Sequence, residues 1–137
     1  MRLVCFAMFL LCATVAGCGS NSPFKYTKAS GKVSYDDGTP IPGIRLVFVA
    51  QDAAAVGTSH PRPAMANVDA QGNFDCVTSY KYGDGLIPGK HKVFFQGAVE
   101  NSGKPTVPKE YLSELTTPLI VDTANLPLDI KVPKPKK

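Results

Sequence analysis

GKVSYDDGTPIPGIRLVFVA, residues 31–50, contains two apolar segments and the turn that joins them. In residues 31–35, Val33 and Tyr35 alternate with polar residues, as expected of a half-buried strand. Residues 36–43 hold an Asp-Gly pair and two prolines; glycine supplies a positive φ and proline stops a hydrogen-bond ladder. Residues 44–50 are almost continuously apolar, which indicates a central strand. The stretch therefore predicts a strand, a turn and a second, more deeply buried strand.

The same pattern continues along the chain. Twelve glycines and twelve prolines separate short apolar segments in a chain of 137 residues without tryptophan. Short strands at regular spacing with turn signals between them predict an all-β sandwich. We expect strands at 30–35, 44–50, 64–69, 73–79, 90–96, 117–121 and 126–132, with 64–69 and 73–79 forming a hairpin. Residues 108–112 are expected to form a helical turn or a short edge segment, and long loops are expected at 51–63 and 97–107.

Three motifs follow one another in a recognisable order. Residues 31–43 hold Gly-x-Val, the Asp-Gly turn and Pro-x-x-Gly; residues 69–74 hold Asp-x-x-Gly-x-Phe; and residues 87–93 hold Pro-Gly followed by a strand. Together they resemble the carboxypeptidase regulatory-like, or transthyretin-like, domain. The resemblance implies a seven-stranded Greek-key sandwich of the prealbumin type. Domains of that family are mostly non-catalytic accessories that bind partners or stand on cell surfaces.

One position departs from the family pattern. His91 stands where the family usually has a tyrosine that packs and hydrogen-bonds at a strand corner. We expect His91 either to do the same job or to be exposed.

The N-terminus resembles a bacterial lipoprotein signal. Arg2 precedes an apolar run at 3–15 that is too short to span a bilayer comfortably, and Val15-Ala16-Gly17-Cys18 follows as an aliphatic residue, two small residues and a cysteine. The resemblance implies a lipid on the Cys18 thiol and cleavage before Cys18. The alternative is an ordinary secreted protein that is cut near Ala16. Because Gly19 rather than Asp follows Cys18, the resemblance favours the outer membrane of a bacterial envelope, with the domain outside the cytoplasm.

These observations predict four parts: a signal peptide at 1–17, a lipidated tether at 18–29, a β domain at 30–132 and a basic tail at 133–137. The formal net charge is +4. We expect the tail to be a solvated, frayed terminus, the alternative being contact with anionic lipid, glycan or phosphate. Modest charge and an extracytoplasmic location argue against nucleic-acid binding.

The predicted cleavage determines which cysteines remain in the mature protein. Cys5 and Cys12 leave with the signal peptide and Cys18 takes the lipid, so Cys76 is left alone in the mature chain. Cys76 lies in an alternating segment, and a lone cysteine there is expected to behave as a small buried hydrophobe.

No catalytic or cofactor site is predicted. His60, in a proline-rich loop, and His91, in a strand, are the two histidines, and they do not form a nucleophile–base–orienter set by sequence. Two distant histidines and one free cysteine do not make a zinc site. Asp36, Asp37, Asp69 and Asp84 all lie near turns, which indicates turn chemistry rather than the alternative of a surface calcium site. We therefore expect a non-enzyme without metal or cofactor.

Tyr80, Lys81 and Tyr82 are the candidate ligand-binding residues. Two aromatic rings beside a cation, next to the loop at 51–63, suit stacking on a sugar ring; the alternative is one core-capping tyrosine and one surface tyrosine. Two functions remain open. The first is a structural or protein-interaction module of the envelope that recruits a partner at a strand edge. The alternative is a surface module that binds a glycan or a peptide.

Overall fold

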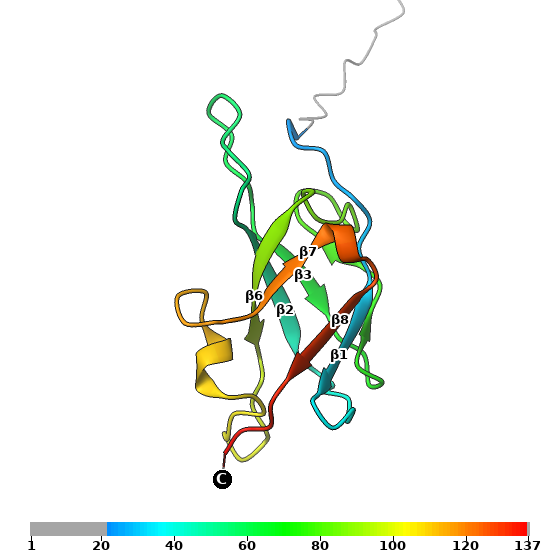
Figure 1. Cartoon of the computed structure of the whole chain (residues 1–137), viewed down its shortest axis with the longest axis vertical. Coiled ribbons are helices and arrows are strands. Elements are labelled where there is room, and N and C mark those ends of the chain that lie inside the picture. The colour runs from blue at the N-terminus through cyan, green and yellow to red at the C-terminus, as the bar shows by residue number, and fades with distance from the viewer. Residues whose placement is uncertain (1–21, 137) are drawn as a thin grey trace, which may run out of the picture.

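The computed structural model describes residues 22–136 and consists mainly of strands (Figure 1). Its strands are β1 (Gly31–Tyr35), β2 (Arg45–Ala50), β3 (Ala64–Asn67), β4 (Asn73–Phe74), β5 (Val77–Thr78), β6 (Lys90–Gln96), β7 (Ile120–Asp122) and β8 (Leu128–Val132). Two short 3₁₀ helices, η1 (Lys109–Leu112) and η2 (Thr123–Asn125), precede and follow β7. The predicted all-β class is confirmed, and 108–112 takes the helical-turn alternative.

The strands form two sheets. Three strands pair in the order β4-β1-β8, and five pair in the order β5-β3-β2-β6-β7. In the small sheet, β1 is antiparallel to β4 and parallel to β8, with Val33 opposite Ile130. In the large sheet, β2 is antiparallel to both β3 and β6, with Phe48 opposite Ala64 and Val93. β2 is therefore central, as its apolar sequence predicts.

The apolar faces of both sheets share one core. Strand alternation places Val33 of β1, Phe74 of β4, Phe48 of β2 and Phe95 of β6 in a single buried cluster. The rings of Phe48 and Phe74 lie 6.0 Å apart between centroids, so the two sheets contact each other through aromatic side chains.

The predicted hairpin of 64–69 with 73–79 is confirmed for residues 77–78, which pair antiparallel with β3, and is wrong for residues 73–74. Residues 73–79 divide into two strands: β4 pairs with β1 in the small sheet, whereas β5 pairs with β3 in the large sheet. The chain changes sheets between them at Asp75 and Cys76, and corners of two-sheet folds are commonly made this way. The crossing buries both Phe74 and Val77, and it raises the number of strands from the expected seven to eight.

The other boundaries differ by small amounts. β7 starts at Ile120 rather than at residue 117, because Pro118 has no N–H for a ladder and the Thr117 side chain bonds to the backbone of β6. The Thr117 hydroxyl is buried and donates to the Val93 carbonyl at 2.6 Å.

The segment before β1 packs against the domain. Thr27 and Leu86 exchange two backbone hydrogen bonds of 2.7 and 2.9 Å, and Ala29 is buried. Gly85 allows this approach, because a Cβ there would lie 2.0 Å from the Thr27 carbonyl oxygen. Residues 27–29, expected in the tether, therefore lie against the fold.

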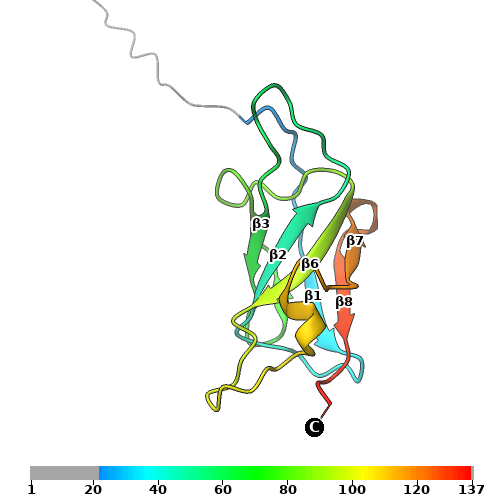
Figure 2. The ribbon, with the colours of Figure 1, turned by 90° about the vertical axis from the view of Figure 1, so that its left-hand side faces the viewer.

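The strands run along the long axis, so the connections gather at two ends (Figures 1 and 2). The start of the described chain and the loop at 51–63 lie at one end; the turn at 36–43, the loop at 97–107 and the C-terminus lie at the other. At this second end Lys134 pairs with Asp37 at 2.5 Å and lies 5.4 Å from the centre of the Tyr35 ring. The tail is thus solvated at Lys134, whose side chain is about half exposed and pairs with the β1–β2 turn.

Candidate functional site

The loop that carries the candidate residues is organised by Asp84. Its carboxylate accepts hydrogen bonds from the backbone N–H groups of Ser79 (2.7 Å), Tyr80 (2.9 Å) and Lys81 (2.8 Å). Partial burial opposes the charge on Asp84, but these N–H groups outweigh it and lower the pKa of the carboxyl. The loop is therefore closed by one ionised side chain, which fixes the backbone on which Tyr80, Lys81 and Tyr82 stand.

Tyr80 packs against the neighbouring loop. The Arg62 guanidinium lies 4.8 Å from the centre of the Tyr80 ring, within the range of a cation–π contact. The Ser79 hydroxyl donates to the Arg62 carbonyl at 3.2 Å, which adds a second link. The structure thus brings Tyr80 to the end of the 51–63 loop, as the sequence hypothesis requires.

Tyr82 has different neighbours from Tyr80. Its side chain is 88% exposed and stands at the rim of a hollow of about 320 Å³ on the outer face of β2, β3 and β5. We call this the β2–β3 hollow; it is lined by Arg45, Met65, Asn67, Asp75, Cys76 and Tyr82. A hydrogen bond to the Cys76 thiol is the largest of the effects that raise the pKa of Tyr82.

The polar wall of the β2–β3 hollow is set by strand register. Arg45 and Asn67 are directly opposite each other on β2 and β3, and the Arg45 Nε–H donates to the side-chain Oδ1 of Asn67 at 3.1 Å. Met65, two residues earlier on β3, adds an exposed apolar side chain to the same face. Sequence reasoning did not find these residues, because alternation shows that they point outward but not that they meet.

Cys76 is less buried than predicted. It lies at the crossing between β4 and β5, is only partly buried, and places its Sγ 4.0 Å from the Thr78 hydroxyl. The expectation of a buried small hydrophobe is wrong because the alternating segment around Cys76 is not one continuous strand.

The two histidines occupy unlike environments. His91 is 2% exposed on β6, its Nδ1 lies 3.2 Å from the Gly89 carbonyl, and burial lowers its pKa. His91 therefore packs and hydrogen-bonds, which is the first of its two expected roles. His60 lies exposed in the 51–63 loop.

Turn chemistry accounts for three of the four turn aspartates. Asp37 accepts the Thr39 N–H, Asp69 accepts the N–H groups of Gln71 and Asn73, and Asp84 closes its own loop. Within residues 22–136, no three His, Cys, Asp or Glu side chains form a group that could hold a metal ion.

A second hollow, of about 370 Å³, lies where the edges of the two sheets approach each other. We call it the β7–β8 hollow; its lining includes Lys90, Ile120, Val121, Leu128 and Asp129. Ile120 is 56% exposed there. Sequence reasoning named a free strand edge without saying which one, because the edge is defined only once both sheets are formed.

Cys18, the predicted lipid attachment site, lies outside the described residues. Over the described part of the chain, no helix has the length and apolarity needed to cross a membrane. No protein-family model matches this chain, and comparisons with curated proteins and with solved structures find no match either.

Proposed function

We propose that this chain is a lipid-anchored lipoprotein of the bacterial cell envelope whose β domain binds a partner polypeptide and catalyses no reaction. We further propose that the domain is a transthyretin-like, Greek-key sandwich of the prealbumin type. Two sheets with a shared core, and the three motifs in their expected order, support that assignment.

The observation that carries partner binding is the free edge of β8. β8 ends the small sheet and pairs with β1 alone among the described strands. The Leu128 N–H donates to Ser30 O at 2.9 Å and the Val132 carbonyl accepts the Asp36 N–H at 3.0 Å, so the parallel register turns the backbone groups of Asp129 and Lys131 outward. Such an edge accepts an added strand, and the β7–β8 hollow beside it offers Ile120 and Val121 to the side chains of that strand.

The partner is tested by crosslinking in cells, purification of the lipidated protein and mass spectrometry of what copurifies. We expect one dominant protein, recovered at least about tenfold less with Lys131→Pro, because proline removes an outward N–H from the edge. Lys136→Pro is the matched control, since it makes the same change in an exposed tail residue. Equal recovery with both variants would contradict docking at β8. Ile120→Asp, which places a charge at the rim of the hollow, gives a second test if Lys131→Pro fails to fold.

The anchor is tested separately by the intact mass of the protein extracted from membranes. We expect a chain that begins at Cys18 and carries a diacylglyceryl group and an N-acyl chain, because two or three chains make a stable anchor. Cys18→Ala is expected to leave the membrane fraction without this lipid. A mature chain with an unmodified thiol at Cys18 would overturn the anchor.

Glycan binding is the second candidate, and the β2–β3 hollow is the observation that favours it. An exposed ring at the rim, with Arg45, Asn67 and Asp75 below it, combines a stacking surface with hydrogen-bonding groups. Titration of a soluble cell-wall oligosaccharide should then show about tenfold weaker binding for Tyr82→Ala. Tyr80→Ala separates two arrangements: it leaves affinity unchanged if the hollow is the site, and lowers it if both rings form one platform. If the oligosaccharide produces no heat of binding with the unsubstituted protein, glycan binding is excluded.

A further inference from the structure

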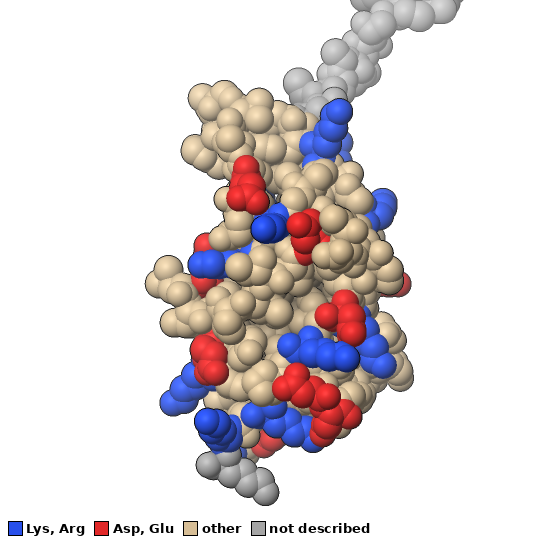
Figure 3. All heavy atoms as spheres, in the orientation of Figure 1, with Lys and Arg blue, Asp and Glu red and all other residues tan. Residues whose placement is uncertain are grey.

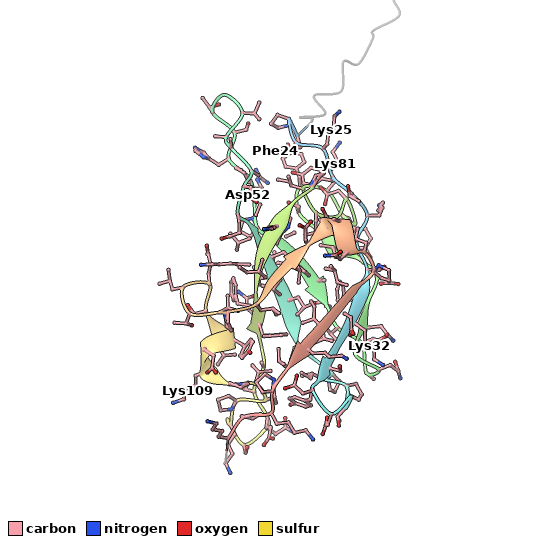
Figure 4. All side chains as sticks on the ribbon, viewed as in Figure 1. Phe24, Lys25, Lys32, Asp52, Lys81 and Lys109 are labelled. Carbon is pink, nitrogen blue, oxygen red and sulfur yellow. The ribbon has the colours of Figure 1, made fainter. Side chains whose placement is uncertain are left out.

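One end of the molecule combines three segments that are distant in sequence. The described chain begins there at residue 22, and the 51–63 loop projects beside it (Figures 1 and 2). Lys28 donates a hydrogen bond to the Gly83 carbonyl of the Asp84-closed loop, and Figure 4 shows Lys81 of that loop at the same end of the molecule as Phe24 and Lys25. We call this surface, formed by residues 22–28, 51–63 and 79–85, the tether end.

The tip of the 51–63 loop contains no charged side chain of Asp, Glu, Lys or Arg and is closed by its own backbone hydrogen bonds. Residues 53–61 contain no Asp, Glu, Lys or Arg, and Figure 3 shows this projection as uncharged. Val56 and Ser59 exchange two backbone hydrogen bonds of 2.9 and 3.0 Å across a tight turn at Gly57, and the Val56 side chain is 50% exposed. Since the tip satisfies part of its own backbone, moving it out of water costs less than moving an open loop.

Basic residues outnumber acidic residues at the tether end. Lys25, Lys28, Arg62 and Lys81 are all exposed at the tether end. Its acidic residues are Asp52 and Asp84, and the Asp84 carboxylate already accepts three backbone N–H groups. The tether end is thus basic at its base and uncharged at its tip, which is the pattern of a protein surface that binds an anionic bilayer.

Chain length brings this end to a membrane if the proposed anchor is correct. Three residues separate Cys18 from Ser22, and the four Cα–Cα steps between them reach at most about 14 Å in an extended chain. A lipid on Cys18 would therefore hold the tether end near the headgroups, where attraction to anionic lipid acts over about one Debye length.

We propose that the tether end docks onto an anionic phospholipid surface, with the 51–63 tip at the headgroup boundary and Lys25 and Lys81 against lipid phosphates. This inference rests on the proposed lipid anchor at Cys18. Docking stands the long axis of the domain away from the bilayer and leaves the β8 edge on its side open to a partner.

The test uses the lipidated protein with Cys76→Ser and Val56→Cys, so that a fluorophore can be attached at position 56 alone. The labelled protein is reconstituted in phosphatidylcholine vesicles with or without phosphatidylglycerol. We expect phosphatidylglycerol to shield the fluorophore from acrylamide, a neutral quencher in the water phase. Each lysine contributes about fivefold to attraction, so Lys25→Gln with Lys81→Gln should lower the ratio of docked to undocked domain about 25-fold. Lys32→Gln with Lys109→Gln, which removes the same charge far from the tether end (Figure 4), should keep the shielding.

The outcomes separate the two proposals. Intact mass is measured first, and a chain without lipid on Cys18 overturns the anchor together with the docking that rests on it. A lipidated protein whose fluorophore is quenched equally in both vesicle types overturns docking and leaves the anchor standing. Equal loss of shielding in the two double variants would also overturn docking, because shielding would then depend on the net charge of the protein and not on lysines at the tether end. Amide hydrogen exchange of residues 53–60 in the protein without the labelling changes repeats the comparison.

Discussion

Asp37 and Lys134 form an ion pair between the turn after β1 and the C-terminal tail. Asp37 lies in the turn after β1, and its carboxylate accepts the Thr39 N–H at 3.0 Å as well as the Lys134 ammonium. These contacts lower the pKa of Asp37 from 3.8 to about 2. The hydrogen bond from Lys134 is the largest cause, and the hydrogen bond from the Thr39 N–H is the next. Because both side chains are about half exposed, the pair is expected to hold the tail in place more than to stabilise the fold.

The first prediction concerns the acid titration of Asp37. The folded pKa lies below the unfolded value, so the stabilisation is present above 3.8 and is lost as the pH falls toward 2. Carbon NMR of the carboxyl should give a midpoint near 2, and Lys134→Gln should move it toward 3.8. Lys131→Gln, which removes the partner of Asp129, serves as the control and should leave the midpoint in place. An unmoved midpoint in Lys134→Gln would show that Thr39 alone sets the pKa.

His91 predicts a second pH dependence, at higher pH. Burial lowers its pKa from 6.5, so the unfolded chain binds the proton more readily than the folded protein. The stabilisation is therefore full above 6.5 and declines as the pH falls below that value. Urea unfolding between about pH 7.5 and about pH 5 should show this decline, and His91→Phe should flatten it. His60→Phe is the control; a slope that persists in His91→Phe would assign the decline to other groups.

At the scale of the element, β1 is the middle strand of the small sheet. It lies between β4 and β8, and its first residue is a glycine for a steric reason. A Cβ on Gly31 would lie 2.2 Å from the Leu128 carbonyl oxygen and 2.8 Å from Cζ of Phe74. The same glycine opens the family-like motif, so the motif has a packing explanation in this chain.

Gly31→Ala is accordingly expected to lower the free energy of unfolding by about 2–3 kcal/mol, because backbone must move to admit one methyl group. Gly103→Ala is the comparison. Gly103 has a φ of +78° and no atom within 4 Å of the place a Cβ would take. Its substitution should therefore lower the free energy of unfolding by only about 1 kcal/mol, the cost of an alanine in the left-handed region. Urea denaturation measures both, and equal losses would mean that β8 moves aside freely.

At the scale of the whole molecule, the two sheets are held together by side chains rather than by shared strands. Phe48 of β2 is fully buried against Phe74 of β4, and the chain between β4 and β5 is the short crossing at Asp75 and Cys76. Packing across this interface therefore determines whether the domain unfolds as one unit.

Phe48→Ala should cost about 3–5 kcal/mol, since it leaves a cavity between the sheets. Leu115→Ala, at a side chain that is 90% exposed, should change stability by less than about 0.5 kcal/mol. Thermal unfolding followed by near- and far-ultraviolet circular dichroism checks both values. Separate transitions for the two signals in Phe48→Ala would show that one sheet survives without the other.

The sequence alone predicted the features that depend on neighbouring residues. Alternation in 31–35 and 90–96, the apolar run at 44–50 and the aspartates at turns all depend on neighbours within a few positions, and they predicted most strands and the all-β class. The proposed lipid site at Cys18 likewise rests on adjacent residues alone.

The tertiary structure was needed wherever the outcome depends on pairing between distant segments. It assigned Phe74 and Val77 to different sheets, placed β1 parallel to β8, buried His91, and joined Arg45, Asn67 and Tyr82 around one hollow. Period-two alternation tells which side chains share a face of one strand, but not which strand lies alongside it. The physical reason is that register and sheet membership are fixed by burial of the common core, to which every strand contributes at once.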